Sequence, residues 1–86
     1  MAAPISMDER REHFAYCVQL FGGTTAFSRR LGIDERAIRR FINGERPLSA
    51  GLLEDTVKAL RLLIAEATTA EGQITATLGS LPRNPS

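Results

Sequence analysis

Apolar residues in the segment 35–43 recur at the three- and four-residue spacing of an α-helix. At about 100° per residue, one side of this helix carries four apolar side chains: Ala37, Ile38, Phe41 and Ile42. The opposite arc, about 140° wide, carries the polar ones: Glu35, Arg36, Arg39, Arg40 and Asn43. The pattern predicts a short helix that buries one side and exposes three arginines, a shape suited to a groove of DNA.

The same spacing predicts two helices before this one. The first spans about 6–21, opened by a capping box at 6–9, and is stopped by two consecutive glycines. The second spans about 25–31, with Thr24 or Thr25 as its cap. Gly32 then makes a turn before the 35–43 helix.

The 35–43 helix has predicted caps at both ends, with Asp34 at its start and Gly44 in the left-handed conformation at its end. A further helix, capped by Ser49, begins at Ala50 and extends to about residue 69. Thr68, Thr69 and Gly72 weaken its continuation, so a single long helix and a break at 68–72 both stay open.

The expected fold is all-α, a small bundle of four or five helices with a long C-terminal helix. We expect residues 1–5 to form a disordered lead, 6–78 the domain and 79–86 a flexible tail. Tyr16 and the four phenylalanines are expected in the core, because most of them lie on apolar helix sides.

Charge is concentrated in one part of the chain. The net charge is only +1, but residues 24–47 hold six arginines against three acidic residues: Arg29, Arg30, Arg36, Arg39, Arg40 and Arg46, against Asp34, Glu35 and Glu45. This local excess favours electrostatic attraction to phosphate around the predicted groove-binding helix.

Residues 24–47 resemble the helix-turn-helix of the phage repressor and Cro family, and residues 8–66 resemble its lambda-repressor-like DNA-binding domain. The resemblance is carried by five apolar positions, a turn glycine and two closing pairs: Phe27, Leu31, Ile33, Ile38 and Phe41; Gly32; Asn43-Gly44 and Arg46-Pro47. Ser28 departs from the pattern, since the family usually has alanine there.

The resemblance implies that Glu35, Arg36 and Arg40 face bases, and Arg39, on the same arc, is grouped with them although it can also reach phosphate. The residues expected to contact phosphate flank them: Thr24, Thr25, Arg29, Asn43 and Arg46. Two alternatives stay open. Arg29, Arg30 and Arg39 can form an ordinary solvated surface, and Glu35 can either read a base or neutralise an arginine.

The long helix carries more apolar side chains than the short helices can cover. We expect its far part to form a homodimer interface: Leu60, Leu63, Ile64, Ala67, Ile74 and Leu78. A dimer would present two recognition helices to a pseudo-palindrome. The alternative is that residues 70–81 fold back as a fifth helix and cover this stripe.

Other function classes find little support. His13 and Cys17 are the only histidine and cysteine, too few for a zinc site, and no catalytic pair or phosphate-binding loop is visible, so we expect no metal, no cofactor and no enzymatic activity. The chain has no apolar run of membrane-spanning length and no signal-peptide pattern at its start, which predicts a cytoplasmic protein.

The sequence thus predicts a DNA-binding transcriptional regulator, most simply a dimeric repressor of a double-stranded operator. One alternative is an antitoxin-like interaction protein that binds a partner through its C-terminal helices and regulates its own synthesis. A second is a protein-binding module that keeps the helix-turn-helix as scaffold, which the basic side of the 35–43 helix disfavours.

Overall fold

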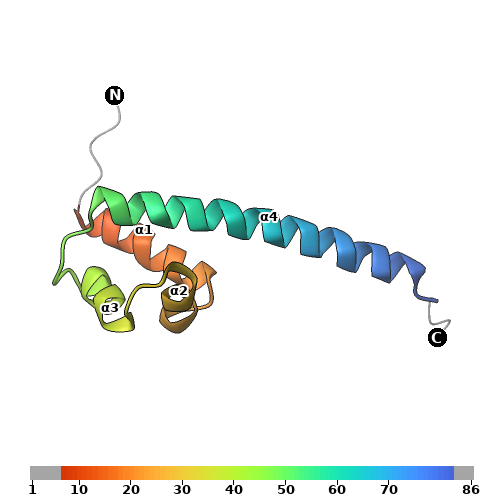
Figure 1. Ribbon diagram of the computed structural model, residues 1–86, viewed down its shortest axis with the longest axis horizontal. Coiled ribbons are helices and arrows are strands. Elements are labelled where there is room, and N and C mark those ends of the chain that lie inside the picture. Colours follow the sequence, from red (N-terminus) through yellow and green to blue (C-terminus); the bar gives the residue numbers. More distant parts are fainter. Residues whose placement is uncertain (1–6, 83–86) are drawn as a thin grey trace, which may run out of the picture.

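The computed structural model describes residues 7–82, and in that range helices are the only regular secondary structure. The four helices are α1 (Met7–Leu20), α2 (Thr24–Leu31), α3 (Glu35–Asn43) and α4 (Ala50–Ser80). Helices α1 and α2 pack against the first half of α4, α3 packs against α1 and α2, and the second half of α4 runs on beyond them (Figure 1). The all-α expectation, with four helices and a long C-terminal one, is confirmed.

Phenylalanine rings from α1, α2 and α3 form the centre of the core. Phe14 and Phe27 are buried and meet edge to face, with ring centroids 5.5 Å apart. Phe41 contacts Phe14 at 6.2 Å, and Phe21 contacts Phe27 at 5.2 Å. The buried cluster is completed by Val18, Ile38 and Leu52. The core therefore draws on all four helices and holds α3 by its apolar side.

Tyr16 does not belong to this core, contrary to the expectation. Its side chain is 61% exposed. The buried residues of α1 are Phe14 and Val18, and Tyr16 is two positions from each, about 200° around the helix. Leu20, two positions after Val18, is 51% exposed for the same reason.

The predicted turns and caps around α3 are confirmed. Gly32 has a φ of 71° and its N–H donates to the Ser28 carbonyl at 2.8 Å. Gly44 ends α3 with a φ of 81°. The Asp34 carboxylate accepts from the Arg36 N–H at 3.4 Å, and at the start of α4 the Ser49 hydroxyl accepts from the Leu52 N–H at 3.1 Å.

The start of α2 differs from the expectation that Thr24 or Thr25 caps it. Gly23 is the N-cap, with a φ of 107°, and no side chain bonds the first amides. Thr24 and Thr25 are the first two residues of the helix. The reason is that Gly22 and Gly23 both take positive φ, so the chain reverses within two residues and the helix begins directly after them.

Helix α4 is continuous, so neither a break at 68–72 nor a folded-back fifth helix is present. It extends through Gly79 and Ser80, which were assigned to the tail. Threonine hydroxyls are satisfied within the helix, since Thr68 donates to the Ile64 carbonyl at 2.8 Å and Thr77 to the Gln73 carbonyl at 2.9 Å. The helix therefore accommodates these threonines with their hydroxyls bonded inside it.

The long helix makes the molecule elongated. At 1.5 Å per residue α4 is about 46 Å long, and the chain measures 56 × 37 × 25 Å. Its radius of gyration is 17.7 Å, against about 12 Å for a compact chain of this length. Parts of three predicted segments lie outside the described residues: the lead at 1–5, the first residue of the capping box at 6–9, and the end of the tail at 83–86.

Candidate nucleic-acid interface

Helix α3 turns its apolar side to the core and its arginines to solvent. Ile38 is completely buried, and Ala37, Phe41 and Ile42 are half-buried. The exposed residues of α3 are its three arginines and its last residue: Arg36, Arg39, Arg40 and Asn43. The amphipathic pattern predicted from the sequence is therefore present in the structure, and the basic side of α3 is accessible.

Glu35 connects the starts of α2 and α3. The Thr25 hydroxyl donates to Glu35 Oε1 at 2.8 Å, and Arg39 Nη2 lies 3.7 Å from the same oxygen. A carboxylate that accepts a hydroxyl and faces a guanidinium is partly neutralised. Two roles were left open for Glu35, and this geometry provides one of them, the contact with an arginine. The hydrogen bond also joins Thr25, predicted to contact phosphate, to Glu35, predicted to face a base.

The remaining arginines of α3 differ in their partners. Arg40 Nε lies 3.9 Å from Glu45 Oε2, at the outer limit of an ion pair between two exposed groups. Within residues 7–82 the Arg36 side chain has no ion pair or hydrogen bond, and it is exposed. Its guanidinium therefore keeps its full set of donors for a ligand.

The far end of α3 gathers three further polar or basic residues. Asn43 is the last helical residue, and Arg46 lies over the Phe41 ring, its guanidinium carbon 5.3 Å from the ring centroid. Arg11 of α1 reaches the same end, because a Cβ placed on Gly44 would lie 2.9 Å from Arg11 Nη1. The sequence analysis missed Arg11, since nothing local signals an approach between residues so far apart in the chain.

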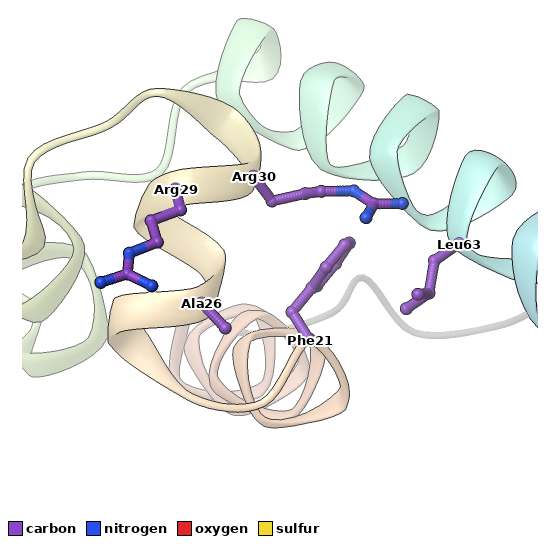
Figure 2. Close-up of a pocket in the computed structure, with 5 residues that line it drawn as sticks. All are labelled: Phe21, Ala26, Arg29, Arg30 and Leu63. Atoms are coloured by element: carbon purple, nitrogen blue, oxygen red, sulfur yellow. The ribbon is translucent and has the colours of Figure 1, made fainter.

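The adjacent arginines of α2 point in opposite directions (Figure 2). Arg30 extends toward α4, pairs with Glu66 and lies over the Phe21 ring, 5.9 Å from its centroid. Arg29 points the other way and is exposed. Arg30 thus holds α4 against α2, whereas Arg29 remains available for a phosphate contact.

Leu63, which was predicted at the dimer interface, is partly covered by its own chain. With Phe21, Ala26, Arg29 and Arg30 it lines a hollow between α2 and α4, and Figure 2 shows it beside the Phe21 ring. Its side chain is half-buried. Leu60 is also half-buried, in a groove beside α1, whereas Ile64 is 63% exposed.

The structure also locates the two residues that were considered as metal ligands, His13 and Cys17. His13 is exposed and Cys17 is half-buried on α1, and no group of three metal-ligating side chains exists among residues 7–82. Burial raises the pKa of the Cys17 thiol, partly opposed by a backbone hydrogen bond. None of the described helices combines the length and the apolar character that crossing a membrane requires.

No protein-family model, curated protein or solved structure matches the chain. The site is therefore interpreted from its own geometry. An exposed helix with three arginines follows a second helix and a glycine turn, and further basic groups flank it at both ends.

Proposed function

We propose that this chain binds double-stranded DNA with sequence specificity, as a lambda-repressor-like domain of the phage repressor and Cro type, and acts as a transcriptional regulator, most simply a dimeric repressor. The observation that carries the proposal is the geometry of α3, whose buried Ile38 fixes the helix while its three arginines face solvent. A rigid scaffold that presents guanidinium groups along one helix is suited to reading base edges in the major groove.

Arg36 is the principal base-reading residue in this proposal. It lies in the first turn of α3, and its side chain makes no ion pair or hydrogen bond within residues 7–82. A guanidinium in that position can donate two parallel hydrogen bonds to guanine O6 and N7. Arg40, one turn further, supplies the second such group, and its weak contact with Glu45 at 3.9 Å is easily exchanged.

Glu35, Thr25 and Arg39 act together rather than singly. Because Glu35 is bonded to Thr25 and faces Arg39, its negative charge is screened from phosphate. The carboxylate thereby orients Arg39 along the surface of α3. Glu35 keeps a free lone pair that can accept from a cytosine amino group.

The phosphate contacts lie at the two ends of the helix pair. At the start of α2 the Gly23 cap supplies no side chain, so the first amides of Thr24 and Thr25 can donate to a phosphate oxygen. Arg29 is on the exposed side of the same helix. Asn43 and Arg46 serve the other end, both of them exposed.

A second candidate function is an antitoxin-like protein that binds another protein through α4. The observation that favours it is the second half of α4, where Ile74 and Leu78 are 68% and 69% exposed. Co-purification of one defined partner at equal stoichiometry with the expressed chain would support this candidate. Isolation of the chain alone as a homodimer would contradict it.

The experiment that tests DNA binding is selection of bound sequences from a random duplex library. The expected result is an enriched pseudo-palindrome whose half-sites contain guanine at the positions that Arg36 and Arg40 read. Affinity is then measured for the selected duplex and for a scrambled one of equal length. Equal affinity for both, or no enrichment, would refute sequence-specific binding.

A further inference from the structure

The second half of α4 is almost free of charge although it is surrounded by solvent. Residues 67–82 are all exposed, and Glu71 is the one charged residue among them. Their apolar side chains include Ile74, Leu78 and Leu81, each more than half exposed. A helix with solvent on every side normally carries charges around its circumference. This composition indicates a helix that is covered in the functional state.

A groove beside the first half of α4 is lined mainly by apolar side chains and is unfilled in the single chain. It has a volume of about 300 Å³ and lies between α1 and α4, where it is lined by Cys17, Leu53, Val57 and Leu60 together with His13 and Arg10. Tyr16 and Leu20 extend this surface along α1, because they follow His13 and Cys17 at three-residue spacing. The molecule therefore has one uncovered apolar helix and one unfilled apolar groove.

The two features lie on a single stripe of α4. Positions at alternating spacings of four and three residues, the heptad repeat of a coiled coil, run the length of the helix. Seven of the eight are apolar: Leu53, Val57, Leu60, Ile64, Ala67, Glu71, Ile74 and Leu78. The first three line the groove, and the last four belong to the uncovered half. A stripe of this kind fits a second helix of the same repeat.

We propose that two copies of this chain pair through α4 in antiparallel orientation, so that the uncovered half of each α4 lies in the α1–α4 groove of the other copy. The symmetric register places Val57 opposite Ile74, Leu53 opposite Leu78 and Ile64 opposite Ala67 of the second copy. Each groove is filled and each uncovered half is covered. The inference rests on the dimer in the proposed function and does not depend on DNA binding.

The charges on α4 favour the antiparallel pair over a parallel one. In a parallel pair the Glu71 carboxylates of the two copies would face each other at a core position. In the antiparallel register Glu71 lies opposite Leu60, next to Arg61 of the second copy, an exposed residue on the flank of the stripe. The antiparallel register thus gives the one charge of the stripe an opposite charge within reach.

The arrangement also suits two DNA-binding helices. Val57 and Ile64 lie roughly a quarter turn around α4 from the buried Leu52 and Thr56. The second copy therefore docks beside α4 and not beneath it. Because α1, α2 and α3 lie beneath α4 (Figure 1), a two-fold axis through the helix pair leaves both α3 helices facing the same way, as one duplex requires.

Disulfide cross-linking of the full chain tests the register. In a Cys17→Ala background, Val57→Cys and Ile74→Cys are prepared singly, mixed to allow subunit exchange, and oxidised. Both sites are exposed in the single chain, 44% and 68%, so folding should be preserved, which circular dichroism checks. The expected result is a shift to dimer mass in the mixture and monomer mass for either variant alone. Leu62→Cys, on the opposite side of α4 and 55% exposed, is the control that should stay monomeric.

Dimer mass from Val57→Cys alone and from Ile74→Cys alone would indicate a parallel pair and overturn the proposal. Sedimentation of the wild type as a monomer, without cross-linking in the mixture, would overturn it as well. In that case enrichment of a single half-site by the wild type would leave the DNA-binding proposal intact. A cross-linked dimer that selects no sequence would instead refute DNA binding and retain the antiparallel pair.

Charge reversal provides an independent measurement. Arg61→Glu and Glu71→Arg should each weaken dimerisation in sedimentation equilibrium, and the double variant should recover wild-type dimerisation, because it restores opposite charges across the interface. Asp55→Arg, an exposed change two positions before Val57 and so about 160° around α4 from it, is the control and should dimerise as the wild type does. Equal behaviour of Glu71→Arg and Asp55→Arg would contradict the register.

Discussion

Replacement of Arg36 by alanine separates base reading from phosphate binding at the site where the structure makes the distinction sharpest. The side chain is exposed and has no ion pair or hydrogen bond within residues 7–82. Truncation therefore removes no internal contact of that kind, and the free energy of unfolding should change by less than about 0.5 kcal/mol. Any loss of binding then belongs to the interface with DNA.

The expected loss follows from the hydrogen bonds that Arg36 can make. A bidentate arginine–guanine pair contributes about 1–3 kcal/mol of discrimination, which is a factor of about 5 to 150 in the dissociation constant. Affinity for a scrambled duplex should fall much less. Arg36→Lys keeps the charge but loses the planar pair of donors, so it should retain non-specific binding and lose most of the preference at one base position.

Fluorescence anisotropy with the selected duplex, single-base variants of it and a scrambled duplex measures these quantities. Lys58→Ala is the control for charge, since Lys58 is exposed on α4, away from α3. Equal losses of Arg36→Ala on selected and scrambled duplexes would refute base reading and leave Arg36 as a phosphate contact. A loss equal to that of Lys58→Ala would remove it from the interface altogether.

Three further predictions concern residues at the end of α3, in α4 and in α1. Arg46→Ala should reduce the slope of log affinity against log salt by roughly one unit, because one phosphate contact is lost; an unchanged slope would exclude Arg46. Gly44→Ala should lower the free energy of unfolding, measured by urea titration, by about 1–2 kcal/mol, since Gly44 has a φ of 81°. Gly72→Ala, in an exposed helical position with nothing near the added Cβ, should instead raise the helicity measured by circular dichroism. Cys17 should alkylate more slowly in the folded chain than in urea at the same mildly alkaline pH, because burial raises the pKa of the thiol and only the thiolate reacts; the rate should increase with pH, and equal rates in the two states would contradict the burial.

Local signals in the sequence were sufficient for the turns and for most helix ends. Asp34, Ser49, Gly32 and Gly44 each act through atoms within a few residues, so their residue types predict their roles. Ser28, the position noted as departing from the resemblance, satisfies its hydroxyl locally. Its hydroxyl donates to the Ile33 carbonyl at 2.5 Å across the turn.

Contacts between residues far apart in the chain could not be predicted from the sequence. Thr25 was predicted as a cap, and its hydroxyl instead bonds Glu35 on the next helix. Arg30 and Glu66 pair across 36 positions, and no periodicity signals such a partner. The continuity of α4 was also left open, because helix propensity penalises Thr68 and Gly72, and no local signal decides whether the helix runs through them.

Because the second half of α4 is uncovered, the backbone amides of α4 should fall into two groups that differ in their protection from hydrogen exchange with solvent. Amides in the part of α4 beside the core can exchange with solvent only when packed residues such as Leu52 and Thr56 open, an event close to global unfolding. Residues 67–80 have no tertiary contact to hold them, and an isolated helical segment of that length is marginal in water. Fraying should therefore begin at Ser80 and progress toward Glu66, where the contact with Arg30 stops it. Association of two copies would extend slow exchange to the end of the helix, so the order of this segment depends on protein concentration.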